Sequence, residues 1–126
     1  MIKEFVPYAE SLELKQLGFD EPCFFAFDNC STPMRCTDLR TGEQRFNGVN
    51  YNSSSYTSQP TFSQAFRWFR EKHDLFGIVQ GKGYNHRRYY MYTINGEWHP
   101  SQSTFDIYEE AELACLRKLI EIVKNK

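Results

Sequence analysis

With 126 residues, the chain has the length of one domain around one hydrophobic core, and we expect residues 1–126 to fold as a single domain. Its 15 Lys and Arg residues and 16 Asp and Glu residues give a net charge of −1, which argues against duplex DNA as a partner because duplex binding depends on a strongly basic face. The aromatic fraction is high, at 17%, and aromatic side chains both build cores and stack on planar ligands.

The sequence contains no apolar run long enough to cross a bilayer. Residues 1–16 carry acidic side chains and lack the apolar core of a secretory signal. We therefore expect a cytoplasmic protein without a membrane partner, in which the four cysteines are free thiols.

The N-terminal half predicts one short helix followed by strands and a long loop. A helix is expected over Tyr8–Leu17, ended by Gly18, and a buried strand over Cys23–Phe27. Residues 34–46 predict a hairpin around a Gly-containing turn. The Asn- and Ser-rich segment 47–59 offers little to bury, which predicts a surface loop.

The second predicted helix begins at a capping-box pair, Thr61 and Gln64, and ends near Leu75. Its expected apolar stripe consists of Phe62, Ala65, Phe66, Phe69 and Phe76. A third helix should open with a capping box at Asp106–Glu109 and run to about Val123.

Between these helices the sequence predicts strands over 76–80, 88–94 and 97–99. Gly81–His86 is expected to be a loop, and Asn95-Gly96 a type I′ turn. The whole pattern predicts an α+β fold in which an antiparallel sheet of about five strands packs against three helices, mainly on one face.

For two groups of residues, the cysteines and the pair His73 and Glu112, the sequence leaves the chemical role open. One hypothesis is a zinc site formed by Cys23, Cys30 and Cys36 together with a histidine. Zinc-ligating cysteines are usually spaced more closely than these three. The favoured alternative is that Cys23 and Cys115 are small core residues. No cofactor is therefore expected.

His73 and Glu112 both fall within the apolar faces of their helices. They would pair directly, or His73 would cap the end of its helix as a cation while Glu112 reaches the edge of the packing.

Basic and aromatic residues alternate from Lys82 to Tyr92, and this segment is the predicted ligand site. Arginine binds phosphate and aromatic rings stack on bases, so the pattern is typical of a site for a nucleotide-like molecule. The predicted ligand-binding residues are Lys82, Tyr84, His86, Arg87, Arg88, Tyr90, Tyr92 and Trp98. The alternative is a half-buried strand whose tyrosines cover the core. Gly81-Lys82-Gly83 resembles part of a phosphate-binding loop but lacks its full spacing.

Trp68 lies off the apolar stripe of its helix and is the predicted contact residue for a host protein or for a second copy in a homodimer. Burial of Trp68 under a second layer is the alternative.

Three segments resemble a group of small uncharacterised proteins of bacteriophage and prophage genomes. They are LKQLGFDEPC over Leu14–Cys23, FSQAFRWFREKH over Phe62–His73 and YEEAELACLRKLI over Tyr108–Ile120. The resemblance implies a viral protein inside an infected bacterium, and it carries over no catalytic residue.

No motif pairs a nucleophile with a base, which favours a binding protein over an enzyme. One hypothesis is a non-enzymatic counter-defence protein that sequesters a nucleotide immune signal. The other is a protein-interaction module that inhibits or adapts a host or phage protein. Both depend on the implied viral setting, which is an argument by analogy.

Overall fold

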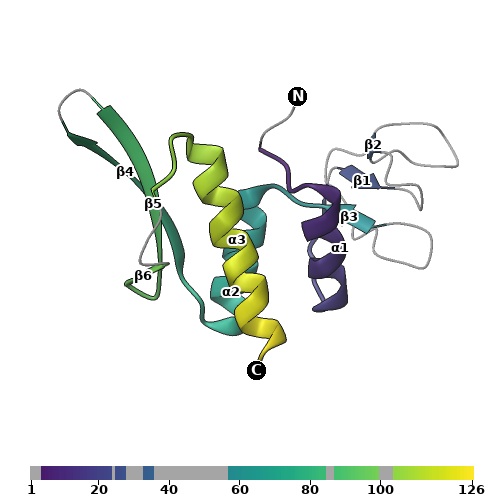
Figure 1. Cartoon of the computed structure of the whole chain (residues 1–126). Coiled ribbons are helices and arrows are strands. Elements are labelled where there is room, and N and C mark those ends of the chain that lie inside the picture. Colours follow the sequence, from purple (N-terminus) through teal and green to yellow (C-terminus); the bar gives the residue numbers. More distant parts are fainter. Residues whose placement is uncertain (1–3, 24, 28–32, 36–56, 85–86, 100–103) are drawn as a thin grey trace, which may run out of the picture. The chain divides into compact units, whose positions relative to one another are not determined.

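The computed structural model describes residues 4–23, 25–27, 33–35, 57–84, 87–99 and 104–126. Its helices are α1 (Tyr8–Gln16), α2 (Phe62–His73) and α3 (Tyr108–Lys124). Its strands are β1 (Phe25–Phe27), β2 (Pro33–Arg35), β3 (Thr57–Gln59), β4 (Gly77–Tyr84), β5 (Arg87–Ile94) and β6 (Glu97–His99). Figure 1 shows these elements, and they confirm the α+β class.

The strands form two antiparallel sheets of three strands each, in the orders β2-β1-β3 and β4-β5-β6. The prediction of one sheet of about five strands is therefore wrong. The central strand of each sheet, β1 or β5, has both of its edges occupied by strands of its own sheet, so it has no edge left for a strand of the other sheet. The chain divides into two compact units, Met1–Gln64 and Ala65–Lys126, with the division inside α2.

In the first unit, α1 ends where the sequence predicts. Gly18 adopts a left-handed φ of 97°, which glycine tolerates without strain. The Gly18 N–H donates to Lys15 O at 3.1 Å and the Phe19 N–H to Leu14 O at 3.0 Å, the Schellman arrangement. Leu14 and Phe19 are both buried, so the chain reversal also contributes to the core of this unit.

The strand β3 corrects the prediction for the polar segment 47–59. Its residues Thr57 and Ser58 are buried and pair with Phe27 and Ala26 of β1. A polar sequence forms a strand here because the backbone of β3 completes the hydrogen-bond ladder of β1, a non-local requirement that composition does not reveal. Residues 36–56, with most of the predicted hairpin and loop, lie outside the described residues.

The capping box of α2 is confirmed. The Gln64 N–H donates to Thr61 Oγ1 at 3.1 Å, and the Thr61 N–H donates to Gln64 Oε1 at 3.0 Å. The Gln64 amide also donates through Nε2 to the carbonyl oxygen of Pro22 at 2.7 Å. This one side chain therefore satisfies the start of the helix and ties it to the preceding chain.

The apolar stripe of α2 is confirmed for Phe62, Ala65, Phe66 and Phe69, which are all buried. The prediction that Phe76 belongs to that stripe is wrong, because Phe76 follows the end of the helix and is 46% exposed. The helix ends at His73 because Asp74 turns into the left-handed region, at φ 55°, and directs the chain into β4.

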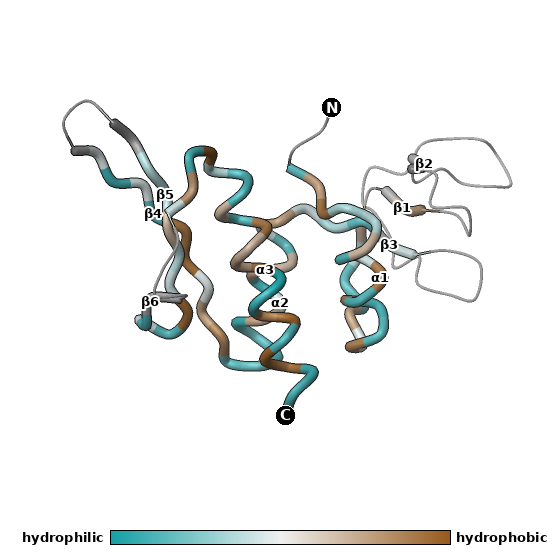
Figure 2. Tube along the Cα trace, viewed as in Figure 1, coloured by the Kyte–Doolittle hydropathy of each residue, from teal (hydrophilic) through white to brown (hydrophobic). Residues whose placement is uncertain are grey.

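In the second unit, α3 lies over the β4–β5 hairpin (Figure 1). A Cβ at Gly77 would lie 2.9 Å from Cys115 Sγ and 3.0 Å from Leu119 Cδ1, so glycine is what permits this close approach. Along α3 the colour in Figure 2 changes repeatedly between hydrophobic and hydrophilic, as expected of a helix with one buried side. Its buried residues are Ala111, Cys115, Leu116, Leu119 and Ile120.

Asn95 and Gly96 form the predicted tight turn between β5 and β6, with φ values of 53° and 83°. The Asn95 side chain has a second role, because its Oδ1 accepts the N–H of Phe76 at 2.8 Å. The turn therefore also holds the start of β4.

The start of α3 differs from the prediction of a capping box at Asp106–Glu109. The N-cap residue is Ile107, which makes no side-chain capping hydrogen bond. Just before it, Phe105 exchanges two backbone hydrogen bonds of 2.8 Å with Tyr90. This bridge pairs Phe105 with β5, and the helix begins only at Tyr108. Among the described residues, no helix has the length and apolar character needed to cross a membrane.

Candidate interaction site on the β4–β5 hairpin

The register of the hairpin divides the predicted ligand site between two faces of the sheet. Directly opposed residues of an antiparallel pair share a face, and Gly81 opposes Tyr90 whereas Lys82 opposes Tyr89. We call the face covered by α3 the helix face. Its strand positions are Gly77, Val79, Gly81, Gly83, Arg88, Tyr90, Tyr92 and Ile94.

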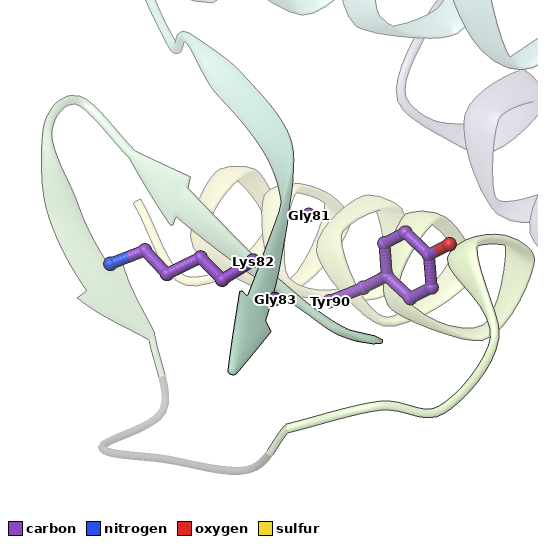
Figure 3. Close-up of a pocket in the computed structure, with 4 residues that line it drawn as sticks. All are labelled: Gly81, Lys82, Gly83 and Tyr90. Atoms are coloured by element: carbon purple, nitrogen blue, oxygen red, sulfur yellow. The ribbon is translucent and has the colours of Figure 1, made fainter. Parts of the chain in front are cut away.

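Lys82 and Tyr90 accordingly point in opposite directions from the hairpin (Figure 3). Gly81-Lys82-Gly83 is also not a loop, because all three residues are paired with β5. The predicted loop Gly81–His86 is therefore wrong for Gly81–Tyr84, which continue β4, and residues 85–86 lie outside the described residues. Gly81 and Gly83 look like a break in a strand, whereas here they are part of it.

Tyr92 is a core residue, 4% exposed, as the alternative for this strand predicts. The pKa of its hydroxyl is raised by burial and then by the neighbouring Cys115 and Glu121. Other predicted ligand residues are not described: His86 as a whole, and the side chains of Tyr84, Arg87, Arg88 and Trp98.

An open hollow of about 200 Å³ lies on the hairpin, lined by Gly81, Lys82, Gly83 and Tyr90 (Figure 3). We call it the glycine hollow. A Cβ at Gly81 would lie 3.1 Å from the Tyr90 ring, so the ring rests directly on the Gly81 backbone. The absence of two side chains, at Gly81 and Gly83, is what leaves this space open.

An exposed aromatic side chain, Tyr108, stands beside Tyr90. The ring of Tyr108 at the start of α3 meets the Tyr90 ring edge to face, with centroids 5.7 Å apart. Tyr108 and its sequence neighbour Ile107 are 42% and 46% exposed. The exposed Tyr108 ring beside Tyr90 favours contact with an apolar or aromatic group.

The outer edge of β4 carries backbone groups that are directed away from β5. Tyr90 uses both its N–H and its carbonyl toward Phe105, on the side of β5 away from β4. Tyr90 and Gly81 are therefore a pair without mutual hydrogen bonds, and the N–H and carbonyl of Gly81 point outward. Because the direction of the backbone groups alternates along a strand, the N–H and carbonyl groups of every second residue of β4 point outward: Gly77, Val79, Gly81 and Gly83.

Among the residues that the structure describes, β5 is the only strand that pairs with β4. Within the described part of the chain, the outer edge is thus an open backbone ladder in which three of the four outward residues are glycines. Sequence reasoning missed this site. The available signal was the spacing of two between Gly77, Val79, Gly81 and Gly83, which matches the period of a strand.

Trp68, the predicted partner-contact residue, is 3% exposed, so the alternative of burial is what the structure shows. Its ring meets that of His73 at 4.9 Å. His73 Nε2 is buried and has no hydrogen-bond partner within the described part of the chain. The pKa of His73 is lowered by burial and then by the charge of Lys126.

The surroundings of His73 favour neither sequence hypothesis. Its ring packs against the rings of Trp68 and Phe69, and its buried Nε2 makes no hydrogen bond to any described residue, the predicted partner Glu112 included. A lowered pKa also disfavours the charged form that helix capping by a cation would need.

Cys23 and Cys115 are fully buried free thiols, which confirms the core alternative for this pair. Burial, followed by the nearby Glu112, raises the pKa of Cys115 to about 12. Cys30 and Cys36 lie outside the described residues, and no cluster of three or more metal-ligating side chains occurs within them.

Comparisons of the chain with protein-family models, with curated proteins and with solved structures found no match. The functional argument therefore depends on the geometry of the hairpin.

Proposed function

We propose that the chain is a non-enzymatic protein-interaction module that binds an extended segment of another protein along the outer edge of β4. The observation that carries this proposal is the outward direction of the backbone groups of Gly77, Val79, Gly81 and Gly83. An extended peptide satisfies such groups by adding a strand to the sheet. Glycines support the proposal because they allow another backbone to approach closely.

Selection from a displayed library of random peptides, followed by affinity measurements, tests this function. Val79→Pro and Gly83→Pro each remove an outward N–H while leaving the hydrogen bonds between β4 and β5 in place. We expect either change to weaken the selected peptides by at least about tenfold, which corresponds to about 1.4 kcal/mol.

Gln80→Ala is the matched control, because Gln80 is exposed on the same strand but its backbone groups face β5. This variant should bind as the parent does. Equal binding by the parent and both proline variants would contradict the proposal.

A second candidate function is binding of a nucleotide-like molecule in a counter-defence role, which follows by analogy from the viral setting that the resemblance implies. The Tyr90 ring above the glycine hollow supports it, since aromatic rings stack on bases. It ranks second because the hollow, at about 200 Å³, is smaller than the roughly 300–1,000 Å³ of typical ligand sites. In addition, the side chain of Lys82 leaves the hairpin on the face opposite to the Tyr90 ring (Figure 3).

A thermal-shift screen against linear and cyclic nucleotides distinguishes the two functions. A ligand at about 100 times its Kd should stabilise the protein by about 2.7 kcal/mol, and Tyr90→Leu should remove that stabilisation. A hit that persists in Tyr90→Leu would rule out this hollow as the nucleotide site. For either function, the cytoplasm of an infected bacterium is the setting that we propose.

A further inference from the structure

The glycine hollow lies on the same strand as the open edge, and this placement restricts what the edge can bind. In a sheet, residues that oppose each other on neighbouring strands point to the same face. A strand added to β4 would therefore place one residue opposite Gly81 and one opposite Gly83, both on the helix face. Their side chains would lie above glycines and not above other side chains.

The space above these glycines suits a large apolar side chain. Tyr90 covers Gly81 from the β5 side, and the hollow of about 200 Å³ remains open beside it. Aromatic side chains on a neighbouring strand are known to stabilise glycine positions in sheets by covering them. The exposed Tyr108 ring, perpendicular to Tyr90, adds an aromatic wall at which edge-to-face contacts form.

A second copy of the chain does not fill this hollow. When two β4 strands pair antiparallel, residues whose backbone groups point outward oppose each other. In every register that pairs most of the two strands, the residue opposite Gly81 or Gly83 would therefore be another outward residue of β4: Gly77, Val79, Gly81 or Gly83. None of these is larger than valine. In one such register Lys82 would also oppose Lys82 of the second copy, which is repulsive.

We propose that the partner of β4 is an extended segment of a different protein, which carries an aromatic or large aliphatic residue opposite Gly81 or Gly83 and inserts it into the glycine hollow beside Tyr90. This inference rests on the proposed interaction function. It adds the chemical class of the partner and identifies Gly81 and Gly83 as the residues that determine specificity.

The test uses peptides selected from a random displayed library on the full chain, and each is then resynthesised with Ala, Leu, Phe or Tyr at every position in turn. We expect one position, or two positions spaced by two, at which Phe, Tyr or Leu binds at least about tenfold more tightly than Ala. The protein variant Gly83→Val places a side chain in the hollow and keeps the outward N–H and carbonyl of residue 83. It should reduce the advantage of the aromatic residue to less than about threefold and leave the Ala peptide unchanged.

The outcomes separate this inference from the proposed function. Peptides that lose binding in Val79→Pro but show no preference for large apolar residues would overturn the inference and leave the proposed function standing. Peptides that bind Val79→Pro and Gly83→Pro as well as the parent would overturn both. Selection of the β4 sequence itself, or a dimer in solution that Val79→Pro dissociates, would overturn the inference in favour of self-association. Substitutions in the peptide do not alter the protein, so the preference is measured even if Gly83→Val does not fold.

Discussion

Gly77 is the residue on which the close packing of α3 against β4 depends. Alanine at this position would bring a methyl group to 2.9 Å from Cys115 Sγ and 3.0 Å from Leu119 Cδ1, shorter than carbon and sulfur atoms tolerate. We therefore predict that Gly77→Ala lowers the free energy of unfolding by about 1–3 kcal/mol, measured by urea denaturation.

The cause can be separated from a general effect on the strand. Cys115→Ala removes the nearer of the two atoms, so the double variant should lose less stability than the sum of the two single variants. Strict additivity would show that the clash is not the cause. Gln80→Ala, on an exposed position of the same strand, should change stability by less than about 0.5 kcal/mol.

His73 should make the stability of the protein depend on pH. Its pKa is lowered in the folded state by burial and by Lys126, so the unfolded state binds the proton more readily below the ordinary value of 6.5. Stability from this group is fully present above pH 6.5 and is lost as the pH falls through that value toward the folded pKa.

Urea midpoints measured between pH 8 and pH 5 test this dependence. In His73→Phe, which keeps an aromatic ring beside Trp68 and cannot take up a proton, the part of the decline due to His73 should disappear. An unchanged decline in that variant would assign it to other groups.

Cys115 and Cys23 should be unreactive in the folded protein. Thiolates are the reactive species, and both side chains are fully buried, with the pKa of Cys115 raised to about 12. In a Cys30→Ser/Cys36→Ser background, iodoacetamide at pH 8 should label neither thiol without urea and both with it, as measured by mass spectrometry. Rapid labelling of Cys115 under native conditions would show that α3 opens readily.

At the scale of elements, the two expected capping boxes differ, and mutation should separate them. Thr61→Ala removes the oxygen that accepts the Gln64 N–H and should cost about 1 kcal/mol, whereas Asp106→Ala should be nearly neutral because the α3 N-cap, Ile107, has no side-chain cap. Urea denaturation of both variants checks the contrast. A large cost for Asp106→Ala would give this residue a role that the start of α3 does not explain.

The β4–β5 hairpin shows why a strand can be mistaken for a loop. Glycine is unfavourable in strands by local preference, so Gly81 and Gly83 suggest a loop when only neighbours in sequence are considered. In the fold, Tyr90 covers Gly81, and the pairing with β5 continues to Tyr84. The cross-strand contact therefore supports a conformation that local preference disfavours.

For the whole molecule, we predict one cooperative unfolding transition, consistent with the expected single domain. The boundary between the two compact units falls within α2, and a helix is continuous through its backbone hydrogen bonds. Far-UV circular dichroism and Trp fluorescence should give coincident urea transitions. Two separated transitions would show that Met1–Gln64 and Ala65–Lys126 unfold independently.

The sequence by itself determined the features that depend on residues a few positions apart. These are the Gly18 stop, the Thr61–Gln64 capping box, the Asn95-Gly96 turn and the buried face of α2. Their patterns are readable because the interacting groups lie within one turn of helix or one tight turn of chain.

Only the tertiary structure decided the two separate sheets, the burial of Trp68 and the placement of Lys82 and Tyr90 on opposite faces. The open outer edge of β4 is another feature that only the tertiary structure decided. Strand partners and register join residues far apart in sequence, and a shift of register by one residue reverses every face. Composition can therefore suggest a basic and aromatic site between Lys82 and Tyr92, but the pairing with β5 determines which of its groups share a surface.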